Sequence, residues 1–202
     1  FSQPNAQGTR YTDERGNSLD AWDYDETDRT FYAAWIVVFT FNEIDNGRSY
    51  SVSKATTANS FAELTVPATY NGKPVTTVEG SAFRGCLKLT TVNIPDTVKL
   101  IETGTAFLNC VALRNVNIYE TGSRDVGGYS SVDGVLIYDN VNNGVELKYF
   151  PQSRSGEYVI PDVVETIPVA IFKSSKLTKV VIPASVTAID ANAFYYSRKL
   201  ED

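Results

Sequence analysis

The sequence AFRGCLKLTTVNIPDTVKLIETGTAFLNC, residues 82–110, contains two copies of one short motif, and this repetition decides the fold. The alanine, phenylalanine and cysteine of AFRGC at 82–86 return 24 residues later in AFLNC at 106–110. Related copies follow at Val169–Ser174 and Asn192–Ser197. Self-similarity at a period of about 20–50 residues is typical of solenoids and other repeat architectures, in which every repeat forms one structural unit.

A second landmark keeps the same spacing as the first. Its clearest copies read LTTVNIP and LTKVVIP, and all copies lie at 61–67, 89–95, 113–119, 155–161 and 177–183. Alternation places Val92 and Ile94 on one face of a short strand, and the proline that follows, which lacks a backbone donor, ends the strand. A single coil cannot bury its apolar face alone, so stacked coils share a continuous core. We therefore expect Phe83, Phe107 and Phe194 to lie buried in one column.

Together the two landmarks resemble the repeat of the BspA-like leucine-rich-repeat family of bacterial cell-surface proteins, L-x-x-I-x-I-P-x-x-V-x-x-I-G-x-x-A-F-x-x-C. The resemblance covers residues 61–202, although Ile171 replaces one phenylalanine, and Ser174 and Ser197 replace two cysteines. It implies a leucine-rich-repeat solenoid, a β-dominated α/β fold of short stacked parallel strands joined by turns or short helices. It also implies an extracellular or cell-surface location, and binding of protein or glycan ligands in adhesion or host interaction.

Patterning divides the chain into three regions. Residues 1–29 are polar and aperiodic and are interpreted as an arm or linker. Residues 30–60 are interpreted as a β-hairpin that caps the exposed first coil, as repeat arrays require. Residues 61–202 are assigned to the solenoid, with a hairpin insertion at about 119–154 in place of repeat sequence.

Two hairpins are predicted from turn signals between apolar segments. In the cap, an aromatic and β-branched segment at Phe31–Phe41 precedes the turn signal Asp45–Gly47 and then Tyr50–Val52. In the insertion, Val135–Tyr138 and Glu146–Phe150 flank a segment rich in Asp, Asn and Gly. We expect this second hairpin to substitute for strands within the stack.

Composition argues against several functional classes. The net charge is −6, and Lys and Arg do not cluster as phosphate binding requires, so no nucleic-acid partner is expected. The chain has no His, which removes the commonest general base and the commonest zinc ligand. We therefore expect no enzymatic activity, no cofactor and no bound metal. No run of about 18 apolar residues occurs, so no transmembrane segment is expected.

Three constellations each allow two interpretations. The acidic cluster at Asp20–Asp28 is either a cation site or a solvated arm, and the absence of a calcium-loop spacing favours the arm. Cys86 and Cys110 occupy the same place in adjacent coils and are either bridged or buried thiols, and serines at that place elsewhere favour thiols. Five tyrosines either stack on sugars or cover the core, which is favoured: Tyr129, Tyr138, Tyr149, Tyr195 and Tyr196.

The candidate ligand-binding face is the outer side of the strands. Residues that alternate with buried Val and Ile must point outward, and we select Thr91, Asn93, Asn115, Asn117 and Lys179. Their polar groups offer donors and acceptors that suit sugar hydroxyls or a peptide backbone. The alternatives are that they are ordinary soluble strand residues, that a ligand binds the loop Asn140–Asn143, or that the chain is a structural spacer within a larger surface protein.

Overall fold

The computed structural model describes residues 38–54, 58, 60–122 and 127–201, together with the backbone of four short N-terminal strands. These strands are β1 (Tyr11–Thr12), β2 (Ser18–Leu19), β3 (Trp22–Tyr24) and β4 (Phe31–Ala33). β1 pairs with β2 and β3 pairs with β4, both antiparallel. The rest of the predicted arm, and the side chains of its acidic cluster, lie outside the described residues.

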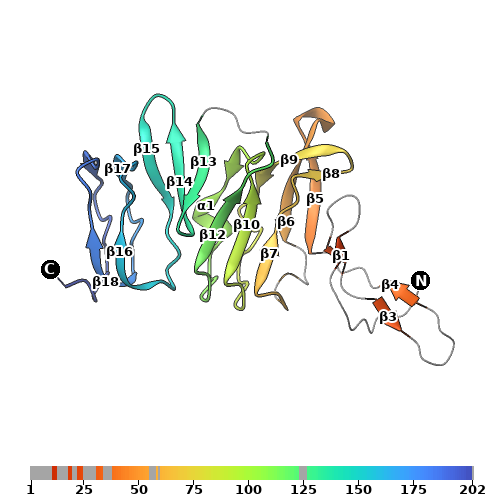
Figure 1. Ribbon diagram of the computed structural model, residues 1–202, viewed down its shortest axis with the longest axis horizontal. Helices are drawn as coiled ribbons and strands as arrows, with labels where there is room; N and C mark the ends of the chain where they lie inside the picture. Colours follow the sequence, from red (N-terminus) through yellow and green to blue (C-terminus); the bar gives the residue numbers. More distant parts are fainter. Residues whose placement is uncertain are drawn as a thin grey trace.

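Stacked coils form the body of the molecule, and their strands build two ladders (Figure 1). The first ladder holds the parallel strands β7 (Glu63–Thr65), β10 (Thr91–Pro95) and β12 (Asn115–Tyr119), and later the parallel pair β16 (Ser155–Val159) and β18 (Lys176–Val181). The second holds β9 (Lys73–Val78), β11 (Leu100–Ile101), β17 (Thr166–Ile167) and β19 (Ala188–Ile189). One helical turn, α1 (Thr103–Ala106), follows β11. The predicted solenoid is confirmed.

A hairpin lies at the N-terminal end of the stack. Its antiparallel strands are β5 (Phe39–Ile44) and β6 (Ser49–Lys54), and β6 pairs in parallel with β9 to extend the second ladder. A two-residue strand, β8 (Thr69–Tyr70), pairs with the other end of β9. The predicted strand at Phe31–Phe41 is divided, because its first residues form β4 and the hairpin strand begins at Phe39.

The insertion is a three-stranded antiparallel meander of β13 (Gly128–Val132), β14 (Val135–Asn140) and β15 (Gly144–Tyr149). The predicted hairpin is β14–β15, and it does replace ladder strands, because β15 pairs in parallel with β17. β13 is not predicted from the sequence, since the glycines that precede it indicate a loop. It turns into β14 through Asp133–Gly134, where both residues have positive φ, 48° and 70°, as tight two-residue hairpin turns require.

In the first ladder the meander leaves a break between β12 and β16, which are not paired. The free edge of β12 is covered by the β13–β14 turn, because the Val116 N–H donates to the Gly134 carbonyl at 2.9 Å. Across the break, the Arg154 guanidinium donates to the backbone carbonyl of Asp133 and, at 2.5 Å, to its carboxylate. This contact fastens the C-terminal coils to the meander.

β14 divides the apolar interior into two cores. Leu136 packs in the core of the N-terminal coils, whereas Val135 and Ile137 pack in the core of the C-terminal coils. Successive strand residues point to opposite faces, and here both faces are buried. β14 is therefore an internal partition that seals one end of each core.

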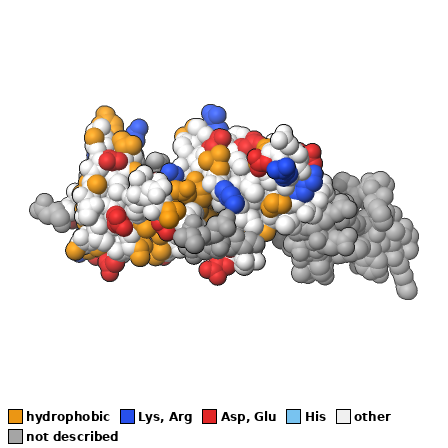
Figure 2. All heavy atoms as spheres, turned by 90° about the horizontal axis from the view of Figure 1, so that it is seen from above, with side chains coloured by type: hydrophobic (Ala, Val, Ile, Leu, Met, Phe, Trp, Pro, Cys, Tyr) orange, Lys and Arg blue, Asp and Glu red, His pale blue; other side chains and the backbone are white. Residues whose placement is uncertain are grey.

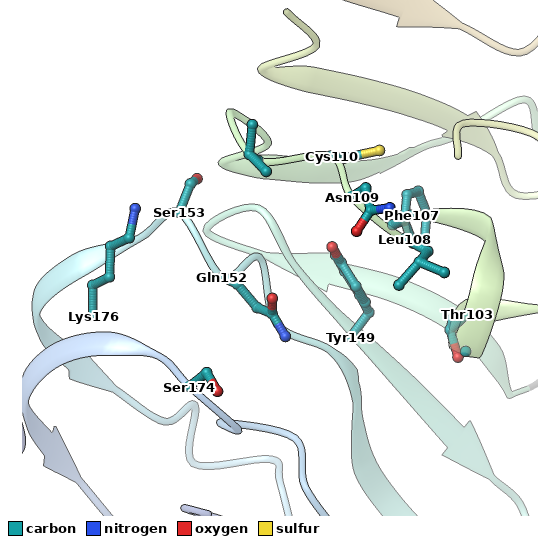
Figure 3. Close-up of a pocket in the computed structure, with 12 residues that line it drawn as sticks. Thr103, Phe107, Leu108, Asn109, Cys110, Tyr149, Gln152, Ser153, Ser174 and Lys176 are labelled. Carbon is teal, nitrogen blue, oxygen red and sulfur yellow. The ribbon is translucent and has the colours of Figure 1, made fainter. Parts of the chain in front are cut away.

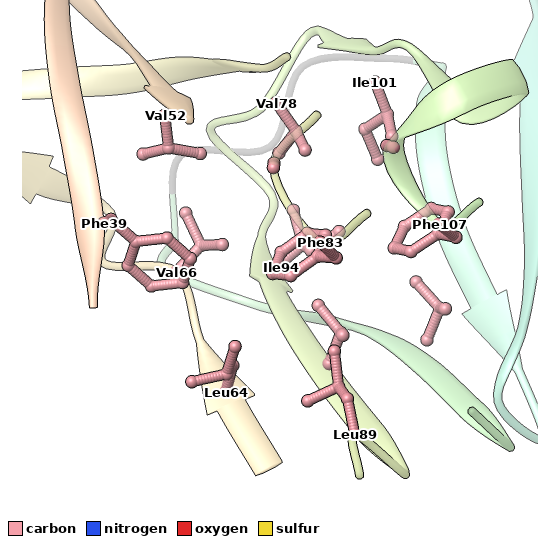
Figure 4. Close-up of a cluster of buried hydrophobic side chains, with 14 of the residues drawn as sticks. Phe39, Val52, Leu64, Val66, Val78, Phe83, Leu89, Ile94, Ile101 and Phe107 are labelled. Atoms are coloured by element: carbon pink, nitrogen blue, oxygen red, sulfur yellow. The ribbon is translucent and has the colours of Figure 1, made fainter. Parts of the chain in front are cut away.

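The predicted phenylalanine column is two columns, which corrects the expectation that Phe194 continues it. Phe83 and Phe107 stack with ring centroids 5.4 Å apart, and Figure 4 shows them in a row within the N-terminal core. Phe194 is half-buried and stacks instead on Phe172, at 5.1 Å. The meander separates the columns, because its Tyr149 packs on Phe107.

The register of the third motif copy also differs from the prediction. The Phe83 N–H donates to the Ala106 carbonyl of the next coil at 3.0 Å, and the Phe172 N–H donates to the Ala193 carbonyl at 2.9 Å. Phe172 thus holds the phenylalanine position, and the following cysteine position falls to Ser175, not Ser174. The large buried ring of Phe172, which stacks on the next coil, decides the register. The prediction matches Ala170 to the alanine of the motif, and this places every position one residue too early.

The cysteine position of the repeat holds a small hydrogen-bond donor. Cys86 and Cys110 are free, buried thiols, as predicted. The Cys110 thiol donates to the Phe83 carbonyl of the preceding coil at 2.9 Å. At the same position of the last described coil, the Ser197 hydroxyl donates to the Phe172 carbonyl at 2.5 Å. Each of these carbonyls also accepts a backbone N–H within its own turn, from Cys86 at 3.1 Å and from Ser175 at 2.9 Å, so the side chain adds a second hydrogen bond that links neighbouring coils.

Candidate functional site

The predicted polar face lies on the outer side of β7, β10 and β12. Parallel pairing aligns two rows of outward residues across these strands, which we call the polar strip: Glu63, Thr91 and Asn115, and Thr65, Asn93 and Asn117. The residues between the rows, Leu64, Val92 and Val116, are buried in the core. The structure therefore brings four of the five selected residues together on one sheet.

Hydrogen bonds between side chains tie the strip together. The Asn93 amide donates to Glu63 Oε1 at 2.7 Å and to Thr65 Oγ1 at 3.2 Å, and the Asn117 amide donates to Asn93 Oδ1 at 3.0 Å. Because a carboxamide has two N–H donors, both donors of Asn93 are used within the strip. Among the described residues, the groups left for a ligand include the second N–H and the oxygen of the Asn117 carboxamide, the Thr91 hydroxyl and the second Glu63 oxygen.

Asn115 is shared between the strip and the meander. A Cβ atom added to Gly134 would lie 2.4 Å from Asn115 Oδ1, so the backbone of the β13–β14 turn rests on this side chain. Lys179 lies elsewhere, on β18 in the separate β16–β18 sheet, where its ammonium is 3.3 Å from Glu157 Oε1. The structure does not bring Lys179 to the polar strip, because the meander interrupts the first ladder between them.

A cleft of about 280 Å³ opens where the meander interrupts the coils, and it was not predicted. We call it the interruption cleft. It lies between the turn at Phe107–Cys110 and the start of β18 at Lys176, with Tyr149 and Gln152 of the insertion between them (Figure 3). The one sequence signal for it is the 64-residue interval between Ala106 and Ala170, which holds no copy of the A-F motif.

Two ionisable groups that line the interruption cleft, the Tyr149 phenol and the Cys110 thiol, have raised pKa values. Burial raises the pKa of the Tyr149 phenol well above its usual range, and a neighbouring Cys110 thiolate would raise it further. Burial also raises the pKa of the Cys110 thiol to about 11. Both groups are therefore protonated and neutral at physiological pH, and the phenol is available as a hydrogen-bond donor.

The tyrosines divide between core and surface. Tyr129 is buried, and Tyr138 and Tyr149 pack against the N-terminal core, as expected. The expectation is wrong for Tyr195 and Tyr196, which are exposed and contact each other in the last described coil. Seen from above, charged side chains of both signs are interspersed over the surface, and apolar side chains gather over the C-terminal half (Figure 2).

A family model described as the BspA type leucine rich repeat region matches residues 54–130 and 76–201, with six copies. The chain belongs to this family. The BspA-type repeat thus accounts for the solenoid, and the meander is where this chain departs from a regular array. Within the described residues, no helix is long and apolar enough to cross a membrane, and no group of three or more His, Cys, Asp or Glu side chains could hold a metal ion.

Solved structures of several leucine-rich-repeat proteins are similar to this chain. A protein of T. pallidum is 21% identical over 81% of this chain and 66% of its own, with a TM-score of 0.49. A protein of Bacteroides ovatus ATCC 8483 is 22% identical over 84% of this chain and 40% of its own, with a TM-score of 0.45. A leucine-rich cell surface protein of Faecalibacterium prausnitzii A2-165 is 16% identical over 93% and 74%, with a TM-score of 0.33. This chain spans less than two thirds of the first two proteins, and no curated protein matches it.

Proposed function

We propose that the chain is an extracellular, surface-exposed binding module whose polar strip recognises a protein or glycan ligand. The observation that supports this is the alignment of six polar residues in two rows on an open sheet face, spaced by parallel strand pairing. Hydrogen bonds hold the amides of Asn93 and Asn117 in fixed orientations, so a ligand would not have to immobilise them. Membership of a family of surface proteins supports the location.

Binding is a better match to this face than catalysis. Its groups are amides, hydroxyls and the single carboxylate of Glu63, and amides and hydroxyls do not ionise near neutral pH, so they cannot act as general acids or bases there. The whole chain has no His to act as general base. We therefore assign the strip to recognition.

A structural spacer is the second candidate, and one observation favours it. Both amide donors of Asn93 are used by neighbours within the strip, as they would be if the ladder served only to satisfy its own polar groups. In that case binding belongs to other parts of the surface protein.

The test blocks the strip without removing its hydrogen bonds. Thr91→Arg adds a long charged side chain to the open face at a position that donates no hydrogen bond to its neighbours, and Ser81→Arg adds the same group in a coil turn away from the strip. Wild type and both variants are applied to immobilised glycans and purified matrix glycoproteins, with folding checked by circular dichroism. We expect Thr91→Arg to weaken binding about tenfold or more and Ser81→Arg to leave it unchanged. Binding equal in both variants would reject the strip, and no binding by wild type would favour the spacer.

A further inference from the structure

The interruption cleft exists because one coil turn is missing from the stack. In the regular coils, the turn at Ala82–Cys86 is covered by the next turn, and the Gly85 N–H donates to the Leu108 carbonyl at 2.8 Å. Asn109 holds the position of Gly85 one coil later, with a similar positive φ of 63° against 70°. No coil turn follows it, and its N–H has no acceptor within the described part of the chain. The space that a further turn would fill is the cleft.

Two more donors at the cleft have no partner among the described residues. The Tyr149 hydroxyl makes no hydrogen bond there, although its ring is packed against Phe107 with centroids 4.5 Å apart. The Lys176 ammonium makes no ion pair there, in contrast to Lys179 on the same strand. Tyr149 is half-buried, and a half-buried donor without an acceptor is costly, so a ligand that supplies an acceptor to its hydroxyl would be favoured. Lys176 is exposed, and its ammonium can turn to the same ligand.

The charge of the lining is also unusual for this chain. The sequence holds 24 acidic against 18 basic residues, yet among the described residues Lys176 is the one charged residue that lines the cleft. Its donors therefore meet no competing carboxylate. The cleft favours a ligand with a single negative charge carried on oxygen atoms, because a doubly charged phosphate would leave part of its charge uncompensated.

The uncharged residues that line the cleft indicate what the rest of the ligand should look like. Phe107, Leu108 and Val111 provide apolar surface, and the Asn109 and Gln152 side chains provide amide groups. The Gln152 amide is held across the cleft by donation to the Lys173 carbonyl at 3.4 Å. Alternating apolar surface and amides suit a ring with hydroxyl groups on its edge. We propose that the interruption cleft binds a carboxylated sugar residue of a glycan, such as a uronate or a sialate, with its carboxylate at Lys176 and Tyr149.

This proposal is independent of the polar strip, so either site can fail without the other. The test titrates the isotopically labelled chain 1–202 with free glucuronate, N-acetylneuraminate and glucose, followed by amide chemical shifts. With either acid we expect the Asn109 backbone signal and the Gln152 side-chain signals to move up to about 10 mM ligand, as for a Kd of about 1 mM. Glucose should move them much less. Equal shifts with glucose, or no shifts with either acid, would overturn the proposal.

Two variants identify the carboxylate contacts. Lys176→Gln removes the ammonium, and Tyr149→Phe removes the hydroxyl but keeps the ring on Phe107. Each is expected to weaken binding of the acid about tenfold, as expected when one charge-assisted contact is lost. Lys88→Gln, which makes the same charge change at an exposed position outside the cleft, is the matched control and should bind as wild type. Equal weakening in the control would show that the effect comes from net charge, and it would reject the site. Shifts caused only by a peptide with a free C-terminal carboxylate, and not by the acidic sugars, would also reject the proposal.

Discussion

The position before the cysteine slot shows how a single residue shapes each coil turn. It holds Gly85, Asn109, Ser174 and Tyr196, with φ values of 70°, 63°, 57° and 58°. This left-handed conformation is easy for Gly and tolerated by Asn, but it is uncommon for Ser and Tyr. The bend points the next side chain at the preceding coil, where Cys110 and Ser197 donate to a backbone carbonyl.

The donor role of the slot gives the first prediction. Ser197→Ala removes the donor that reaches the Phe172 carbonyl from the next coil, although that carbonyl keeps the Ser175 N–H, and it also removes the acceptor of the Ser175 hydroxyl. It should lower the free energy of unfolding by about 1 kcal/mol. Ser197→Cys keeps a small donor in the form that Cys110 already uses and should lower it by less than half as much. Chemical denaturation of the three proteins decides the matter. If both variants lose the same stability, the slot selects for size alone.

Buried thiol and phenol groups give a second prediction, at alkaline pH. Burial raises the pKa of Cys110 to about 11 and that of Tyr158 to about 12, from 9.0 and 10.0. The folded state then holds these protons more tightly than the unfolded state, so their contribution to stability is complete below about pH 9 and is lost as the pH rises towards 11 and 12. Urea midpoints should be flat from pH 7 to 9 and then fall. A flat profile through pH 11 would show that these groups are solvated.

The same burial predicts the reactivity of the two thiols. Cys86 and Cys110 should react slowly with iodoacetamide in the native protein, because almost no thiolate is present and access is blocked. After unfolding without reductant, both should be alkylated. Mass spectrometry distinguishes this outcome from a bridge, in which neither thiol would gain an alkyl group.

Among the elements, the β13–β14 turn has the most demanding geometry. Gly134 has a φ of 70°, and an added Cβ atom would lie 2.4 Å from Asn115 Oδ1 and 2.9 Å from its Cα atom. Gly72 has almost the same φ, 73°, but an added Cβ atom there would meet nothing within 4 Å. The two glycines therefore separate backbone strain from close packing.

Replacing each of these glycines with alanine gives the third prediction. Gly72→Ala should lower the free energy of unfolding by about 1–2 kcal/mol, the cost of a left-handed L-residue. Gly134→Ala adds an overpacking cost of about 1–3 kcal/mol and should separate the turn from β12. Urea denaturation measures both variants against wild type. Equal losses would mean that the turn does not rest on Asn115.

Local sequence patterns were sufficient to predict the strands of the regular coils, but they were insufficient to predict the structure of the interruption. The alternation around Val92 and the proline after it correctly placed β10, and its parallel partner β12 followed from the repeat. β13 was missed because its strand signal is weak and its position depends on pairing with β14. The separation of Lys179 from the strip and the interruption cleft were missed for a related reason: both depend on a coil that the sequence lacks, not on residues that it contains.

At the scale of the whole molecule, the solenoid is two cores joined through one strand. β14 contributes Leu136 to one core and Val135 and Ile137 to the other, so neither core is closed without the meander. In the described residues no coil lies beyond β18 and β19, and Ile182 and Ile189 are 42% and 52% exposed. Their counterparts inside the N-terminal stack, Ile94 and Ile101, are 0% and 2% exposed. In repeat arrays stability depends on such contacts between neighbours.

Hydrogen–deuterium exchange of backbone amides tests most directly whether the meander is an internal partition of the solenoid. Buried, paired strands exchange through large-scale opening, whereas weakly packed segments exchange through local fluctuation. We expect amides of β14 at Val135–Asn140 to be protected as strongly as those of β10, and amides of β18 and β19 to exchange sooner. Rapid exchange throughout β14, with β10 and β18 both protected, would contradict the account, because the insertion would then be a peripheral loop and not the partition between two cores.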